Sequence, residues 1–230
     1  VAALQMRVVA SGQPIARQVI NVESSFWFNP ELNYKTFMVP GILVLLVTMI
    51  GAFLSSMNIV REKEIGTIEQ INVTPIQKYQ FVIGKLLPFW LLGLMVLSIG
   101  LIVAKVVFNI PFVGSVGLIY AFSAVYLLLI LGFGLLISTL TDTQQQAMFL
   151  AWFFLVVFIL MGGLFTAIEN MPGWAQTITL FNPIRYFIEF VRLVMLKGAG
   201  WQETRFFFAV IFGYAVLLNG LAILNYKKTA

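Results

Sequence analysis

Five long stretches of the chain carry no ionisable side chain, and this pattern constrains the fold more than any other feature. The stretches are Thr36 to Val60, Leu86 to Ala104, Val106 to Thr141, Thr143 to Ile168 and Phe206 to Tyr226. A helix needs about 20 mostly apolar residues to cross the hydrocarbon core of a bilayer. Trimmed at turn residues, the stretches predict five membrane-spanning helices, at 38–60, 86–105, 118–140, 145–168 and 206–226. A β-barrel strand would alternate polar and apolar residues, whereas the run from Ile42 to Val47 is apolar throughout. We therefore expect an all-α polytopic membrane protein.

The composition excludes several classes of protein and of chemistry. Charged residues make up 10% of the chain and hydrophobic residues 60%, whereas an average soluble domain has about 25% charged residues. Neither a soluble globular domain nor a disordered chain fits these proportions. Because the chain has no cysteine and no histidine, we expect no catalytic residue and no metal site. The net charge of +5 comes from basic residues scattered between the apolar runs, which favours membrane flanks over a nucleic-acid surface.

The densest charge cluster, residues 61–75, lies between the first two predicted spans. Ile65, Ile68 and Ile71 recur at every third position, so they share one side of a short helix that Pro75 ends. This pattern predicts an amphipathic helix at the membrane surface. Two interpretations are open, a solvated loop helix or a docking element for a soluble partner.

A second short helix is predicted in the region 169–205, before the last span. Asn182 is a suitable N-cap, and Pro183 suits the first turn of the helix that follows. Arg185, Glu189 and Arg192 fall at i, i+4 and i+7, so they form one polar stripe. The helix, at 184–197, is too short to span a membrane, and we expect it to be interfacial or re-entrant.

The middle of each predicted span holds no charged residue, which argues against a proton-coupled carrier and suggests that another subunit delivers the energy. Polar residues in the spans are more often used in hydrogen bonds between helices than in a transport pathway. Gly51 and Ser55 form a small-xxx-small pair, typical of close helix packing. The candidates for a pathway or a subunit interface are Thr48, Gly51, Ser55 and Asn58.

The charged segment Glu62 to Gln70, followed by Thr74-Pro75, resembles the coupling helix of type-2 ABC exporter permeases. Asn29-Pro30-Glu31 before Val39-Pro40-Gly41 resembles the outer approach to a span in that family. The resemblance covers about residues 22–228. It assigns the ATPase-coupling role to Arg61, Glu62, Lys63, Glu64, Gly66, Thr67, Glu69 and Gln70. It assigns an outer re-entrant region to Pro172, Trp174, Asn182, Pro183, Arg185, Glu189 and Arg192.

The resemblance also implies an assembly. The family has six spans per subunit, two permease subunits in a homodimer or heterodimer, and two cytoplasmic ATPase subunits, which bind ATP and Mg²⁺. This chain would bind no cofactor itself and would lie in the bacterial inner membrane. Residues 1–37 would be the end of an outer domain and 38–230 the permease domain. The first span is then expected upstream of Val1.

The sequence thus suggests the membrane-spanning permease of an ATP-driven ABC exporter. Its apolar, phenylalanine-rich spans favour an amphiphilic, drug-like or lipid-like substrate, moved out of the cytoplasm or the inner leaflet. Two alternatives are open. One is a non-transporting scaffold or sensor subunit that partners an ATPase, and the other is an ion-coupled secondary carrier.

Overall fold

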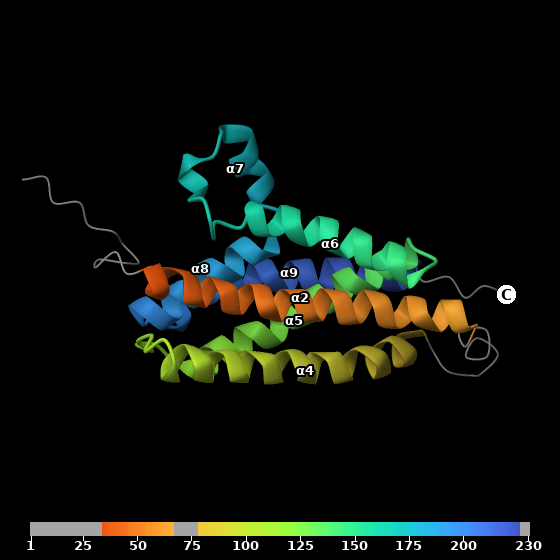
Figure 1. The fold of residues 1–230 in the computed structure, drawn as a ribbon, viewed down its shortest axis with the longest axis horizontal. Helices are drawn as coiled ribbons and strands as arrows, with labels where there is room; N and C mark the ends of the chain where they lie inside the picture. The colour runs from red at the N-terminus through yellow and green to blue at the C-terminus, as the bar shows by residue number, and fades with distance from the viewer. Residues whose placement is uncertain (1–33, 67–77, 226–230) are drawn as a thin grey trace, which may run out of the picture.

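The computed structural model describes residues 34–66 and 78–225, and within these ranges it contains helices and no strand. Five helices lie side by side along the longest axis of the molecule (Figure 1). They are α2 (Tyr34–Ile65), α4 (Lys78–Val106), α5 (Val116–Thr139), α6 (Gln144–Leu160) and α9 (Trp201–Asn225). Between α6 and α9 lie the 3-10 helix η1 (Ile168–Asn170), α7 (Gly173–Thr179) and α8 (Pro183–Lys197).

Four of these helices are long and apolar enough to cross a membrane. They are α2, α5 and α9 over their full lengths and α4 over Ile83–Val106. The apolar helix α6 has 17 residues, which extend about 26 Å at 1.5 Å per residue. The chain is therefore an all-α, multi-pass membrane protein, as its uncharged runs predicted.

The fourth predicted span, 145–168, is shorter in the structure, because α6 ends at Leu160. Gly163 has a φ of 77°, a left-handed conformation that glycine adopts readily and that turns the chain. The side-chain amide of Asn182 donates a hydrogen bond to the Phe158 carbonyl over 2.7 Å, which satisfies one of the last carbonyls of the helix. Hydropathy could not locate this end, because several residues after Leu160 are still apolar.

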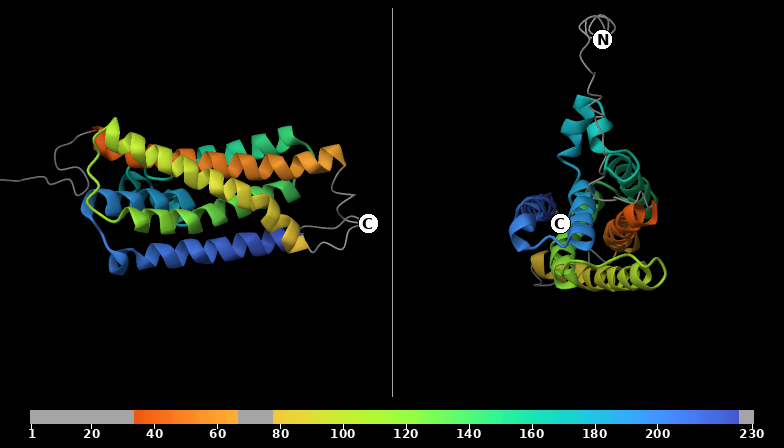
Figure 2. Two further views of the ribbon diagram at one scale, coloured as in Figure 1. Left: turned by 90° about the horizontal axis from the view of Figure 1, so that it is seen from below. Right: turned by 90° about the vertical axis from the view of Figure 1, so that its left-hand side faces the viewer.

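The centre of the bundle is α5, which packs against α2, α4 and α9 (Figure 2). Its side chains Phe122, Tyr126 and Leu131 are fully buried. The Phe122 ring stacks on Phe190 of α8, with 3.8 Å between the ring centroids. A helix that is apolar on every side suits this central position.

Small residues let α2 and α5 approach closely. A Cβ added to Gly134 of α5 would lie 2.7 Å from the Cβ of Ser55, and one added to Gly51 would lie 3.0 Å from the Ile130 Cγ2. The Ser55 hydroxyl donates to the Leu131 carbonyl over 2.7 Å. The predicted small-xxx-small packing is therefore confirmed, and its partner is a helix of the same chain.

The segment of η1 and α7 projects sideways from the bundle (Figure 1). The next helix, α8, packs against the bundle. The Asn182 side chain accepts a hydrogen bond from the Ile184 N–H over 3.0 Å and caps the start of α8, as the sequence predicted. The helix is buried on its apolar side and also at Arg192, against α2, α5, α6 and α9. An interfacial helix would leave its polar stripe in water, so this burial favours the re-entrant alternative.

Candidate functional site

The charged residues Arg61 to Glu64 form the last turns of α2, which runs without a break from Tyr34 to Ile65. The prediction of a separate amphipathic helix starting at residue 61 is therefore wrong at its beginning. The reason is local, because Arg, Glu and Lys are good helix formers and nothing before Gly66 interrupts the helix. Gly66 ends it with a φ of 79° and a hydrogen bond from its N–H to the Lys63 carbonyl over 3.1 Å. The rest of the predicted coupling segment, including Thr67, Glu69 and Gln70, lies outside the described residues.

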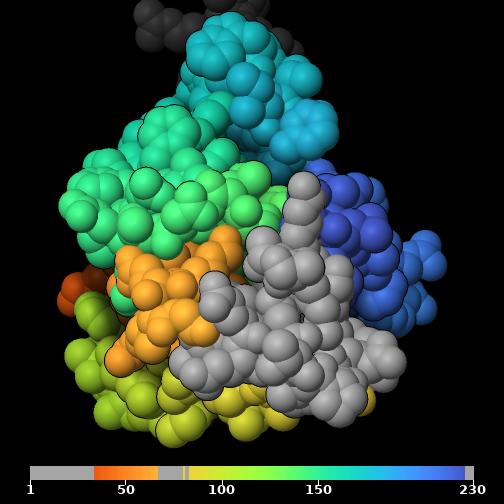
Figure 3. Space-filling model, turned by 90° about the vertical axis from the view of Figure 1, so that its right-hand side faces the viewer, coloured from red at the N-terminus to blue at the C-terminus, as the bar shows by residue number. Residues whose placement is uncertain are grey.

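Lys63 and Glu64 both contact the turn between α5 and α6. The Lys63 ammonium donates hydrogen bonds to the carbonyls of Ser138 and Thr141, over 2.5 and 2.9 Å. The Glu64 carboxylate accepts one hydrogen bond from the Gln144 backbone N–H over 2.8 Å and another from the Gln144 side-chain amide. We call these two residues and their three partners the turn clamp. Figure 3 shows the end of α2, in orange, against the green residues of α6 on this face of the molecule.

The turn clamp matches charge to the ends of two helices. The carbonyl end of a helix attracts a cation, and the N–H end attracts an anion. Over their full described lengths, α5 has no basic residue in its last turn and α6 has no acidic residue in its first turn. Lys63 and Glu64 supply these charges from α2. Adjacent residues of one helix thus complement two neighbouring helices.

The same end of α2 also contacts α4. Glu62 forms an ion pair with Lys85, and both side chains are partly exposed. Arg61 is exposed. Of the five charged residues that the sequence assigned to ATPase docking, four lie in the described residues, and three of these, Glu62, Lys63 and Glu64, make contacts within the chain. Residue spacing alone could not reveal these contacts.

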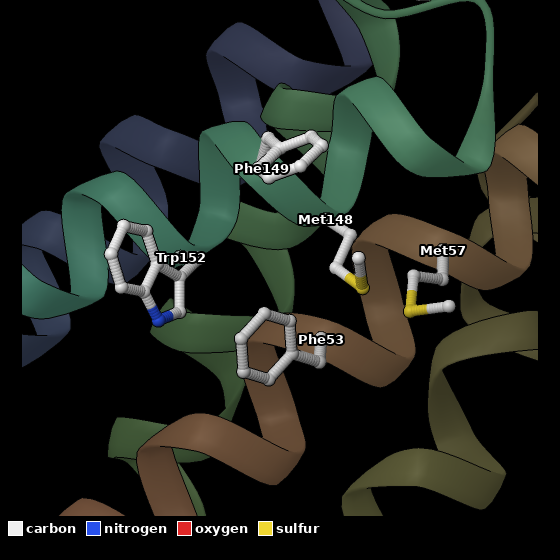
Figure 4. Close-up of a pocket in the computed structure, with 5 residues that line it drawn as sticks. All are labelled: Phe53, Met57, Met148, Phe149 and Trp152. Carbon is white, nitrogen blue, oxygen red and sulfur yellow. The ribbon is translucent and has the colours of Figure 1, made fainter.

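An apolar pocket lies between α2 and α6, the two helices that the Glu64 and Gln144 contact joins. Its volume is about 340 Å³, and it is lined by Phe53, Met57, Met148, Phe149 and Trp152. Figure 4 shows Met148 and Trp152 on the side of α6 that faces Phe53 and Met57 of α2, with Phe149 farther from α2. The sequence analysis missed them, although each helix carries a pair at i and i+4, Phe53 with Met57 and Met148 with Trp152, which marks one helical face.

None of the residues predicted to line a pathway or a subunit interface lines this pocket. Thr48, Gly51 and Ser55 are buried against α5, and the Thr48 hydroxyl is 2.8 Å from the Tyr126 hydroxyl. These three residues pack α2 against α5, as small and hydroxyl-bearing residues often do between helices, and their role at a pathway or a subunit interface stays a prediction. Asn58 is half-buried, and its Oδ1 has no hydrogen-bond partner in the described part of the chain.

The predicted outer residues lie at the opposite end of the bundle. Arg192 is 6% exposed, donates to the carbonyls of Gly163 and Phe37 over 3.3 and 3.2 Å, and lies 3.7 Å from the centroid of the Phe37 ring. Burial lowers the pKa of Arg192 to about 10, so it remains a cation at neutral pH. Burial also raises the pKa of Glu189, while Arg185 opposes that shift.

The other outer residues divide between contact and exposure. Arg185 donates to the Thr179 hydroxyl over 2.6 Å, and Pro183 is buried at the start of α8. Pro172 precedes α7 as its N-cap, and Trp174 is 69% exposed. The structure therefore brings Arg192 and Asn182 to the ends of α2 and α6, whereas Trp174 lies on the projecting segment.

The sequence of this bundle matches the family described as "ABC-2 family transporter protein" over residues 4–224. The chain belongs to this family of ABC transporter permeases. The match covers almost the whole chain and agrees with the resemblance found in the charged segment. The five helices described above thus belong to a permease of this family.

Three relatives from Escherichia coli are similar to this chain. The probable multidrug ABC transporter permease YbhR is 39% identical over 75% of this chain and 47% of its own length. The related permease YbhS is 34% identical over 78% of this chain and 48% of its own length. The inner membrane transport permease YhhJ is 26% identical over 96% of this chain and 59% of its own length. The chain spans about half the length of the first two relatives.

Proposed function

We propose that this chain is the membrane-spanning subunit of an ATP-driven exporter in a bacterial cytoplasmic membrane. A second permease subunit, identical or related, completes the pathway, and separate ATPase subunits bind ATP and Mg²⁺. The observation that carries the proposal is the charged end of α2, Arg61 to Gly66, on a bundle whose spans have no charged residue in their middle. Energy then enters at this end of α2, which faces the cytoplasm.

The pocket between α2 and α6 supports an amphiphilic, largely apolar substrate. Two methionines and three aromatic residues line it. Aromatic and methionine side chains make apolar contacts that adapt to different ligand shapes. The names of two relatives, which are probable multidrug permeases, support the same substrate class. The pathway therefore runs along α2 and α6.

The proposed cycle begins with closure of the ATPase subunits on the segment that follows Gly66. That displacement moves the end of α2, since Gly66 is the direct continuation of the helix. The pocket is lined in part by the same helix, at Phe53 and Met57. Movement of α2 then shifts the pocket relative to the rest of the bundle and releases the substrate on the far side of the membrane.

The test uses the full-length permease, copurified with its ATPase and reconstituted in liposomes. We expect rhodamine 6G, an amphiphilic fluorescent cation, to stimulate ATP hydrolysis and to accumulate inside the liposomes when ATP is added outside, where it reaches the complexes whose ATPase faces outward. A scaffold subunit would bind the ATPase without dye transport. A secondary carrier would transport the dye on an ion gradient without ATP. Either result would overturn the proposal.

A further inference from the structure

The turn clamp lies at the charged end of α2, and the pocket lies further along the same two helices. On α2, Met57 of the pocket and Glu64 of the clamp are seven residues apart, about 10 Å along a helix. On α6, Gln144 and Met148 are four residues apart, about 6 Å. The clamp therefore ties the two pocket-lining helices together at the end from which the proposed displacement comes.

Beneath the clamp, α2, α5 and α6 share a buried apolar cluster. Val60 of α2, Ile137 of α5, and Ala147 and Ala151 of α6 are buried together. Small and β-branched side chains at these positions hold the three helices in close contact. The hydrogen bonds of Lys63 and Glu64 lie just beyond this cluster. The apolar packing sets the distance between the three helices, and the hydrogen bonds set how the end of α2 is oriented against α5 and α6.

We propose that Lys63 and Glu64 are positioning residues that hold α6 on α2, so that displacement of the segment after Gly66 moves both pocket-lining helices together. The inference rests on the proposed function for the source of that displacement. Without the clamp, α2 would move while α6 lagged behind, so the two walls of the pocket would separate and part of each ATP-driven movement would carry no substrate. The clamp thus sets how much transport each ATP drives.

A merely structural role for Glu64 would be to stabilise the N-terminus of α6, and two double variants separate this role from the proposed one. Glu64→Ala with Gln144→Glu returns a carboxylate to the first turn of α6 but leaves α2 unlinked. Glu64→Gln with Gln144→Glu exchanges the amide and the carboxylate, so the two side chains can again form a hydrogen bond.

The single variant Glu64→Ala removes the hydrogen bond between α2 and α6. Glu169→Ala, which removes an exposed carboxylate beyond the end of α6, is its matched control.

The variants are made in the permease with its ATPase, reconstituted as above, and the readout is rhodamine 6G transported per ATP hydrolysed. We expect about a fivefold loss for Glu64→Ala, with no recovery when Gln144→Glu is added. Glu64→Gln with Gln144→Glu and the control Glu169→Ala should keep the wild-type ratio. Recovery in the Glu64→Ala and Gln144→Glu double variant, or an unchanged ratio in Glu64→Ala, would overturn the inference.

A second readout needs neither ATP nor dye. Residues 1–230 contain no cysteine, so Met57→Cys and Met148→Cys place one thiol on each side of the pocket, and any cysteine elsewhere in the full-length permease is replaced by serine. We expect a short bismaleimide to cross-link this pair several times faster with Glu64 than with Ala at that position. Equal rates would show that Glu64 does not hold the helices together. If the unmodified complex fails to transport the dye with ATP, the proposed function is overturned, and the cross-linking rates still decide whether the clamp holds α6.

Discussion

The two ends of α6 are both tied to other elements, but by contacts of different kinds. At its C-terminal end, Asn182 and Arg192 reach the Phe158 and Gly163 carbonyls, and these two side chains are 2% and 6% exposed. At its N-terminal end, the hydrogen bonds are between Glu64 and Gln144, on the surface, next to the apolar packing of Ala147 and Ala151. Buried hydrogen bonds to a charged group are costly to break, whereas exposed ion contacts contribute little to stability.

This difference assigns separate tasks to the two ends. The buried contacts make the α8 end a fixed anchor, which joins the start of α2 at Phe37 to the end of α6. The exposed contact of Glu64 at the charged end orients α6 on α2 but adds little to the free energy of unfolding. The bundle can then pivot about its α8 end when its charged end is pushed, which is the movement that the proposed function requires.

The largest effect on stability is expected for Arg192→Leu. The substitution removes two hydrogen bonds and the contact with the Phe37 ring, and we expect a loss of about 3 kcal/mol in the free energy of unfolding. Titration with a denaturing detergent measures it. Arg205→Leu, at an exposed arginine of α9, is the control. Equal losses in the two variants would remove the basis for a fixed anchor.

Asn182→Ala tests the same anchor at its second contact. The change removes the cap of α8 and the hydrogen bond to the Phe158 carbonyl, and we expect a loss of about 2 kcal/mol. Asn170→Ala, at an exposed asparagine, should leave the free energy of unfolding unchanged. If Asn182→Ala also proves neutral, the end of α6 is held by packing alone.

Gly66→Pro acts on the junction at the other end. Proline cannot adopt a φ of 79° or donate the hydrogen bond to the Lys63 carbonyl, so the chain must leave α2 in another direction. We expect ATP hydrolysis without dye transport, while the helical content measured by circular dichroism stays the same. Gly66→Ala, whose added Cβ would contact none of the described residues, should cost about 1 kcal/mol through backbone strain. Normal transport in the proline variant would contradict a role for this junction.

The smallest effect on stability is expected for Glu64→Ala, because the carboxylate is exposed. The detergent-unfolding midpoint should match that of the unmodified protein, although transport per ATP falls. A loss of stability as large as that of Arg192→Leu would erase the distinction between the two ends.

The sequence predicted the helices well because the uncharged runs are long and are separated by charged or turn residues. It also predicted the Asn182 cap and the Gly51 and Ser55 packing, since both depend on local spacing. It could not place the end of α6, which depends on a contact with Asn182, 24 residues after Phe158. Nor could it find that Lys63 and Glu64 contact residues 75 to 80 positions away, because such contacts follow from the packing of α2 on α5 and α6.

The most direct test of the account asks which end of the bundle touches the ATPase. A photo-crosslinking amino acid is placed at Arg61, exposed at the charged end, or at Lys105, exposed in the last turn of α4 at the other end, and the intact complex is irradiated. The account predicts that the probe at position 61 captures the ATPase and the probe at position 105 does not. Capture from position 105, with none from position 61, would contradict it.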